Sequence, residues 1–357
     1  MTDAARATPR LRVLIVSAGR RVQNNFLPAL TCLKDQFEIV GIHARTTERL
    51  LPLAERWGVT AYANLAQVDF STVDVVAISV PTAQNAVVLN ALLPHAANLQ
   101  VVVDTPVVWR LRELREIGPL LRKFRRILVT EDYMNFPTFA LMRRAAADGL
   151  IGQVSGVTLT NIGYLYHGLA LIRSFCGFKR ARSLWRRAVG GFGEVVGFSF
   201  PGKFRAIVVG PYRSHTTGGI TVDGSKGLLT DFSRDASMDI GRPVYTLKTD
   251  RTEQGLIRRI YLDGADDTYA VDLPEIGVMA AMDFPDKSDL NLLRGCGLMT
   301  VFQALHQPDN INNAYGIDNA LYDSFTSRWA KGGKLALDPF AWFGSDLTAV
   351  IGKAFGR

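Results

Sequence analysis

The sequence predicts an α/β protein in which a doubly wound parallel sheet precedes an α+β domain built on a largely antiparallel, open sheet. The chain has 357 residues, more than twice a typical domain of roughly 150 residues. Up to about residue 130, short apolar runs alternate with helical patterns, whereas beyond residue 149 strand patterns follow one another through Gly-containing turns. We therefore expect a Rossmann-type domain over residues 1–130, an α+β domain over 131–334, and a C-terminal segment over 335–357.

The elements of the first domain follow from its apolar pattern. Short apolar runs predict buried parallel strands, and apolar residues spaced by three and four predict helices. Alternation of the two at this length implies right-handed crossovers and a parallel sheet. We expect strands at 11–16, 37–42, 73–80, 100–104 and 127–130, and helices at 22–33, 47–57, 84–97 and 107–124.

The second domain shows a different order. A run of strands with few helices predicts a largely antiparallel sheet, whose open face is free to receive a substrate or a partner subunit. The expected strands are 154–161, 193–200, 206–209, 219–222, 227–231 and 258–262, and helical patterns return at 290–305 and 318–329.

The composition excludes several classes of protein. Hydrophobic residues make up 48% and charged residues 21%, which is ordinary for a globular protein. Three cysteines do not suffice for a disulfide framework, and five histidines without His-x-x-x-His spacing predict no metal site. No apolar run reaches the roughly 20 residues of a membrane span, and the N-terminus has no secretory signal pattern. We therefore expect a cytoplasmic protein.

The net charge of +8 fits an anionic ligand such as a nucleotide, and it would also attract nucleic acid. No motif for nucleic-acid recognition accompanies the charge, so we expect no nucleic-acid partner.

The turn after the first strand resembles a phosphate-binding loop. In the Gly-x-Gly-x-x-Gly fingerprint, glycines let the backbone approach a pyrophosphate at a helix N-terminus. The stretch 17–22, Ser-Ala-Gly-Arg-Arg-Val, keeps only the middle glycine. Its position between a buried strand and a helix favours a dinucleotide site formed by Ser17, Gly19, Arg20 and Arg21. The alternative is an ordinary strand–helix turn.

The end of the second strand bears on cofactor choice. An acidic residue there would bind the ribose 2′-hydroxyl of NAD. The stretch 43–47, His-Ala-Arg-Thr-Thr, has no carboxylate. Arg45, helped by Thr46, could instead pair with a 2′-phosphate, which favours NADP, with NAD still possible. The alternative is a surface arginine at a helix start.

From Leu11 to about Arg328 the chain resembles the Gfo/Idh/MocA oxidoreductases, the relatives of glucose–fructose oxidoreductase and inositol dehydrogenase. The motifs that carry the resemblance are Gly19-Arg20 with Leu27-Pro28-Ala29-Leu30, the strand ending at Val80-Pro81, Asp104-Thr105-Pro106, the stretch 148–154, and His167.

The resemblance implies hydride transfer to or from a sugar, polyol or related carbonyl compound, and a homo-oligomer formed through the C-terminal sheet. It also implies that Val80, Pro81, Asp104 and Pro106 lie near the cofactor and that His167 lies near the substrate.

Three positions depart from the family pattern. The catalytic lysine falls at Thr105, an acidic residue falls at Gly163, and a further histidine falls at Asn85. Threonine has no accessible pKa for acid–base catalysis, so it cannot replace lysine in kind.

Two explanations compete. In one, acid–base catalysis has moved to His167, whose ordinary pKa lies near neutrality. Tyr133 and Tyr164 would then assist, with Tyr166 a further candidate, and Asp104 would orient a partner. In the other, the protein binds NAD(P) without chemistry, as a regulator or scaffold.

The first explanation gives an NAD(P)-dependent oxidoreductase acting on a sugar hydroxyl or ketone. The positive charge makes a nucleotide-linked sugar plausible as substrate, and a different carbonyl or an imine would also fit. The side chains considered for its phosphates are Arg173, Lys179, Arg180 and Arg182.

Overall fold

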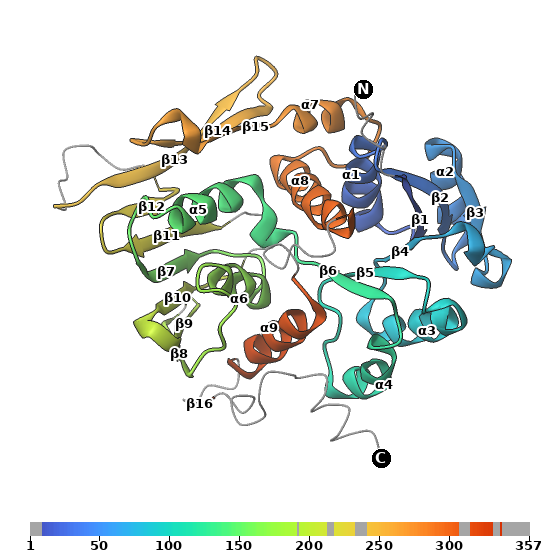
Figure 1. The fold of residues 1–357 in the computed structure, drawn as a ribbon, viewed down its shortest axis with the longest axis horizontal. Helices are drawn as coiled ribbons and strands as arrows, with labels where there is room; N and C mark the ends of the chain where they lie inside the picture. The colour runs from blue at the N-terminus through green and yellow to red at the C-terminus, as the bar shows by residue number, and fades with distance from the viewer. Residues whose placement is uncertain are drawn as a thin grey trace, which may run out of the picture.

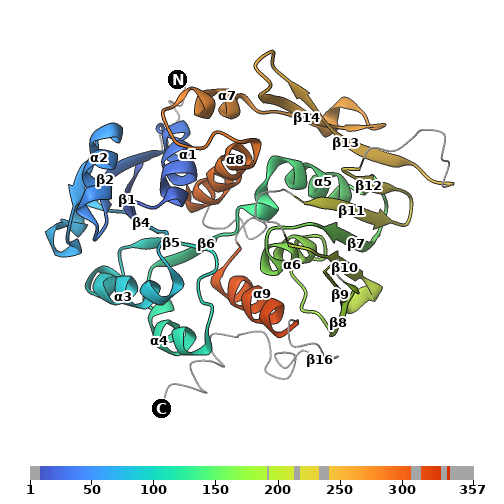
Figure 2. The same ribbon diagram turned by 180° about the vertical axis from the view of Figure 1, so that it is seen from behind.

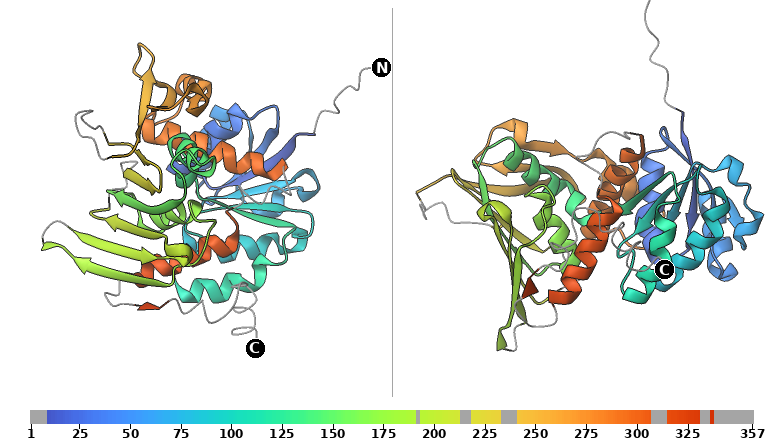
Figure 3. Two further views of the ribbon diagram at one scale, coloured as in Figure 1. Left: turned by 60° about the vertical axis from the view of Figure 1, so that its left-hand side comes forward. Right: turned by 60° about the horizontal axis from the view of Figure 1, so that its bottom comes forward.

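The computed structural model describes residues 9–190, 193–212, 218–232, 241–306, 315–330 and 336–337. Within them, two sheets lie on opposite sides of a pair of helices, α8 (Asp289–Gln303) and α9 (Ile317–Ala330), as Figure 1 and Figure 3 show. The first sheet has the strand order β3-β2-β1-β4-β5-β6, with every neighbouring pair parallel. This is the doubly wound Rossmann order, so the predicted fold class is confirmed.

The elements of the first sheet agree closely with the apolar pattern. All residues of β4 are buried, as expected of a central parallel strand. Helix α2 turns Leu50, Leu53 and Ala54 inward. The strands are β1 (Leu11–Val16), β2 (Phe37–His43), β3 (Thr60–Tyr62), β4 (Val75–Ile78), β5 (Gln100–Asp104) and β6 (Arg126–Thr130). The helices are α1 (Leu27–Cys32), which follows a π-helical turn at Val22–Phe26, α2 (Thr47–Trp57), α3 (Thr82–Leu92) and α4 (Leu111–Leu121).

The second sheet has the order β15-β14-β13-β12-β11-β7-β10-β9-β8-β16 in the described residues. Most of its pairs are antiparallel, but β7–β10 and β12–β13 are parallel. Its strands are β7 (Val154–Thr160), β8 (Ser183–Ala188), β9 (Glu194–Ser199), β10 (Arg205–Val209), β11 (Gly219–Gly224), β12 (Leu228–Thr230), β13 (Val244–Arg251), β14 (Ile257–Asp263), β15 (Ala270–Asp272) and β16 (Ala336–Leu337).

Helices α5 (Pro137–Ala147) and α6 (Leu165–Ser174) cover the inner face of this sheet (Figure 2), and α7 (Pro274–Ala281) follows β15. The sequence did not predict these three helices, nor β8 and β13. Of the segment expected at 335–357, residues 336 and 337 pair with β8 as β16, and its other residues lie outside the described part.

Helix α8 lies on the first sheet's side of the molecule. Its Phe302 packs edge-on against Phe26 at 5.9 Å and Phe37 at 5.8 Å between ring centroids. A late segment of the chain therefore completes the core around β1 and α1. None of the described helices is both long enough and apolar enough to cross a membrane.

Candidate functional site

A cavity of about 430 Å³ opens at the carboxyl ends of β1, β2 and β4. In doubly wound sheets, ligands bind at this edge where the strand order reverses, here between β1 and β4. The cavity is lined by the turn after β1, the end of β2 and the start of α3. Its lining includes six residues predicted to bind the cofactor: Ser17, Gly19, Arg45, Thr46, Val80 and Pro81.

The turn after β1 is tight at its retained glycine. The Ser17 hydroxyl accepts a hydrogen bond from the Gly19 amide at 3.0 Å. A Cβ at Gly19 would lie 3.3 Å from that hydroxyl oxygen. Ser17 itself has φ of 152°, a conformation that favours glycine. Serine thus occupies the first glycine position of the fingerprint and binds the turn's backbone with its own side chain.

The end of β2 gives the cavity a cationic side. Arg45 and Arg49 both line it, and no carboxylate stands among its described lining residues. His43 is buried and donates its Nδ1 hydrogen to the Tyr62 carbonyl oxygen at 2.8 Å. Burial lowers the pKa of His43, which keeps the imidazole neutral at pH 7. The opposite wall is apolar and comprises Leu65, Val87, Val88 and Ala91.

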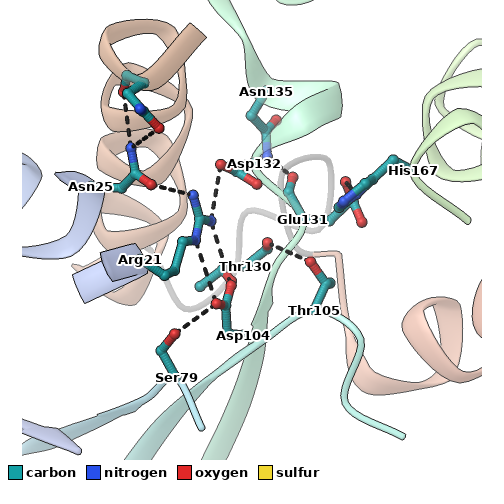
Figure 4. Close-up of polar contacts among 11 residues, drawn as sticks. Arg21, Asn25, Ser79, Asp104, Thr105, Thr130, Glu131, Asp132, Asn135 and His167 are labelled. Atoms are coloured by element: carbon teal, nitrogen blue, oxygen red, sulfur yellow. Dashed lines mark hydrogen bonds and ion pairs between the residues drawn. The ribbon is translucent and has the colours of Figure 1, made fainter. Parts of the chain in front are cut away.

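Four predicted cofactor residues, Arg20, Arg21, Asp104 and Pro106, are not part of this lining. Figure 4 shows the Arg21 guanidinium turned away toward two carboxylates. It lies 2.9 Å from Asp132 and 3.4 Å from Asp104. Asp104 also accepts hydrogen bonds from the hydroxyls of Ser79, at 2.8 Å, and Thr130, at 2.5 Å. A direct contact of these residues with the cofactor stays a prediction.

The polar network extends from the turn after β1 to α8. Arg21 donates to the Asn25 side-chain oxygen at 2.9 Å, and Asn25 donates to the Asn291 carbonyl oxygen at 3.0 Å. The same guanidinium therefore connects the cofactor turn, the ends of β5 and β6, and α8.

Glu131 follows β6 directly and contacts His167 in the first turn of α6. The His167 Nδ1 lies 2.6 Å from the Glu131 Oε1, and Glu131 is completely buried. Burial, reinforced by Asp132, raises the pKa of Glu131 well above its usual value. Burial also lowers the pKa of His167 to about 4. Burial therefore disfavours charge on either group, and the two are joined by this short hydrogen bond.

Tyrosine rings surround His167. Tyr166 lies 4.2 Å and Tyr133 5.6 Å from the imidazole, centroid to centroid. Tyr164 is 48% exposed and stacks on Tyr166 at 5.5 Å. Burial raises the pKa of Tyr133 and of Tyr166, so neither phenol ionises near neutrality. The structure thus brings together the predicted catalytic residues His167, Tyr133 and Tyr164.

The positions that depart from the family pattern make backbone contacts instead. Thr105 donates to the Thr130 carbonyl oxygen at 3.3 Å, and Asn85 donates to the Val107 carbonyl oxygen at 2.8 Å. Neither side chain titrates, so neither takes over the lysine's proton transfer.

The interpretation of Arg173 as a phosphate ligand was wrong. Its guanidinium is buried, lies 2.7 Å from Asp323 and sits over the Tyr322 ring at 4.4 Å. Because its charge is already paired inside the protein, it is not available to a substrate.

The sequence analysis missed Glu131 and Asp132. A signal was present, since both carboxylates come immediately after the predicted strand 127–130, at the sheet edge where parallel strands place functional residues. In the described residues, no three His, Cys, Asp or Glu side chains are arranged to hold a metal ion.

Comparisons with known proteins agree with this geometry. Residues 11–132 match the family model of the Gfo/Idh/MocA oxidoreductases, described as an oxidoreductase family with an NAD-binding Rossmann fold. No curated protein sequence matches the chain.

Solved structures share the fold at low sequence identity. A putative myo-inositol dehydrogenase from Sinorhizobium meliloti 1021 is 14% identical with a TM-score of 0.66, over 92% of this chain and 99% of that one. A putative NADPH-dependent oxidoreductase from Desulfitobacterium hafniense is 14% identical with a TM-score of 0.63, over 95% and 100%. An oxidoreductase from Agrobacterium radiobacter, in complex with NAD⁺, L-tartaric acid and magnesium, is 13% identical with a TM-score of 0.63, over 92% and 98%.

The family match covers the whole first sheet, including the turn after β1 and the carboxylates that follow β6. Residues 11–132 of this chain therefore match the Rossmann domain of the Gfo/Idh/MocA oxidoreductase family, whose fold binds NAD.

Proposed function

We propose that this chain is an NADP(H)-dependent oxidoreductase that transfers a hydride to or from a sugar hydroxyl or ketone, with His167 as its acid–base group. The observation that carries the proposal is the buried Glu131–His167 pair, 2.6 Å apart, at the carboxyl edge of the sheet that also forms the cavity. A neutral imidazole backed by a buried carboxyl is suited to proton transfer near neutral pH.

The cavity fits a dinucleotide with a 2′-phosphate. Its apolar wall suits an adenine ring, and Arg45 and Arg49 supply cations where an NAD-specific site has a carboxylate. The turn keeps a glycine at Gly19, where the absence of a Cβ lets the backbone come close to a pyrophosphate. The structural neighbour from Desulfitobacterium hafniense, a putative NADPH-dependent oxidoreductase, is consistent with this preference.

The bound cofactor supplies or accepts the hydride, and the protein moves the proton. During reduction, the Nε2–H of His167 protonates the developing alkoxide. The Glu131 carboxyl proton passes to Nδ1 at the same time, so the imidazole stays neutral and Glu131 becomes a carboxylate. Oxidation reverses both transfers: the hydroxyl proton goes to Nε2, and the Nδ1 proton returns to Glu131. Arg21 and Arg294, which act electrostatically on His167, favour this neutral imidazole over an imidazolium.

The substrate class rests on the fold's neighbours and on the site's aromatic side chains. Myo-inositol dehydrogenases share the fold, and the exposed Tyr164 offers a ring surface beside His167. A polyol or sugar fits these features best. A nucleotide-linked sugar has less support because Arg173 is paired with Asp323.

The test is binding followed by turnover. Thermal unfolding is measured with NADPH, NADH or neither, and stabilisation by about 2.7 kcal/mol is expected at 100 times Kd. We expect NADPH to stabilise more than NADH. A panel of polyols and sugars, with and without a nucleotide, is then assayed by absorbance of the reduced cofactor. No stabilisation by either dinucleotide would refute the proposal. Binding without turnover across the panel would support the alternative, a regulator or scaffold that binds NADP(H), which the replacement of the family lysine by Thr105 favours.

We also propose a homo-oligomer formed through the outer face of the second sheet. On this face Trp185 is 41% and Ile207 39% exposed. The Trp185 ring lies directly over Gly197, where a Cβ would approach the ring to 2.2 Å, so the indole lies against the sheet. Such a patch is suited to a subunit interface. The mass of the wild type and of W185E is compared by light scattering, and a monomeric wild type would refute the oligomer.

A further inference from the structure

Helix α8 directs one of its faces at the polar network around Glu131. Asn291 on this face accepts from Asn25. Gly297 lies so close to Asp132 that a Cβ there would be 2.6 Å from the Asp132 carbonyl oxygen. Arg294 is three residues from each of them, and residues spaced by three lie on the same side of a helix. The fold thus places Arg294 on the side of α8 that faces the candidate catalytic pair.

Arg294 has no partner there. It is half-buried, and within the part of the chain that the structure describes it makes no hydrogen bond or ion pair. Asp286 lies within its electrostatic reach, but that carboxylate accepts from the Ser288 amide at 3.0 Å. Arg21, on the other side of the network, is held by both Asp104 and Asp132.

The positive charge of Arg294 acts on the site itself. It opposes protonation of His167 and so contributes to the lowered pKa of that residue. It also favours ionisation of Tyr133. A partly buried guanidinium without a counter-ion is unfavourable unless an anion pairs with it. Arginine is also the side chain best suited to bind a carboxylate or a phosphate through two parallel hydrogen bonds.

We propose that Arg294 binds an anionic group of the substrate, so that the sugar or polyol carries a carboxylate or a phosphate in addition to the carbon that reacts. This inference rests on the proposed function, because it assigns a substrate class to the same site. It makes Arg294 a residue that determines specificity, and the proton relay remains with Glu131 and His167.

The test compares three probes that differ at one carbon: D-glucose, D-glucuronate and D-glucose 6-phosphate. Each is titrated calorimetrically into the NADPH-loaded protein. The variants are R294M, which keeps length without charge, and R294K, which keeps charge without the planar guanidinium. The control is R251M, because Arg251 pairs with Asp289 at the start of α8, at 2.7 Å, on the surface.

We expect the wild type to bind one of the two anions about tenfold or more tightly than glucose. The preferred anion identifies the group as carboxylate or phosphate. R294M should lose the preference, R294K should keep part of it, and R251M should keep all of it. NADPH affinity should not change in R294M. Equal binding of the three probes, binding of none of them, or a preference unchanged in R294M would each overturn the inference. Failure of the wild type to bind NADPH would instead overturn the proposed function.

Discussion

Two polar regions share the carboxyl edge of the first sheet and are built in different ways. The cavity draws on three short segments that each follow or end a strand of the Rossmann motif: the turn at Gly19, the β2 end at Arg45, and the start of α3 at Pro81. The Glu131–His167 pair joins the end of β6 to a helix of the second domain, 36 residues further on. The proposed cofactor site is thus built from local sequence, whereas the proposed proton relay depends on the assembly of both sheets and their helices.

This difference is consistent with the proposal that acid–base catalysis has moved away from the position of the family lysine. Thr105 makes only a backbone contact. The titratable group at the edge is instead Glu131, one strand further along the sheet, and burial raises the pKa of its carboxyl. Under the proposal, the acid–base group has moved to the neighbouring strand end, while the proposed cofactor cavity stays in place.

The largest expected effect is on kcat, and it tests whether the Glu131–His167 relay works independently of the cavity. In E131Q and H167N, kcat should fall about 10²–10⁴-fold, because the proton relay is interrupted. NADPH affinity, measured by fluorescence titration, should stay within about twofold in both variants. Because burial disfavours a charged carboxylate at this position, E131Q should unfold at the same or higher temperature at pH 8. A wild-type kcat in E131Q would contradict the relay, and a large loss of NADPH binding would show that the two regions are not separate.

Breaking the Arg173–Asp323 pair should lower the stability of the second domain and leave the structure of the first domain unchanged. R173M leaves the Asp323 carboxylate buried and unpaired, which costs about 3–5 kcal/mol of unfolding free energy in urea denaturation. R173M/D323L should recover part of that loss, since neither charge remains. The control is R182M, at an exposed position, where the change should be within about 0.5 kcal/mol. If R173M were as stable as R182M, the pair would not support the fold.

The pH at which the His167 imidazole titrates offers a further test of the relay. With a pKa of about 4, His167 is neutral from roughly pH 5 upward, so its imidazole signals in NMR should titrate near pH 4 and not near 6.5. Burial is the main cause of this value, and the charges of Asp132, Arg294, Arg21 and Asp104 also act on it. An unfolded histidine takes up its proton at about 6.5, so the contribution of His167 to stability should decline as the pH falls from 6.5 toward 4. Titration at 6.5 would mean that the imidazole is solvated.

On the cofactor side, R45A should raise KM for NADPH about tenfold and leave KM for NADH nearly unchanged, because only NADPH carries the 2′-phosphate. Arg49 remains to bind part of the phosphate charge. The control is R56A, at the far end of α2, where the Arg56 side chain is exposed and lies 3.5 Å from Asp283. An equal effect of R45A on both cofactors would place Arg45 at the shared part of the dinucleotide.

The first sheet could be predicted because buried parallel strands are continuous apolar runs. Helix α6 could not, since eight of its ten residues are buried and no polar face gives a helical period. Strand β8 was hidden for the opposite reason: it lies next to the sheet's short edge strand and carries Arg186 and Arg187.

The residues of the candidate site also fall into those that the sequence could predict and those that it could not. Arg45 and Gly19 stand at fixed offsets from strand ends, so they could be found from sequence. Arg21 is adjacent to the turn, yet its direction depends on Asp104 and Asp132, which the fold brings from 83 and 111 residues away. Spacing along the chain carries no information on such a contact.

The smallest effect concerns the contact that joins the two regions through α8. In G297A, the new Cβ would meet the Asp132 carbonyl oxygen at 2.6 Å, so α8 must shift away from the Arg21–Asp132 ion pair. We expect a loss of about 1–3 kcal/mol of unfolding free energy together with a moderate loss of kcat. The control is G277A in α7, where a Cβ meets nothing within 4 Å and alanine should stabilise by about 0.5–1 kcal/mol. If G297A behaved like G277A, the close approach of α8 to Asp132 would contribute neither to stability nor to kcat. Helix α8 would then belong to neither of the two regions, the locally built cavity and the assembled relay.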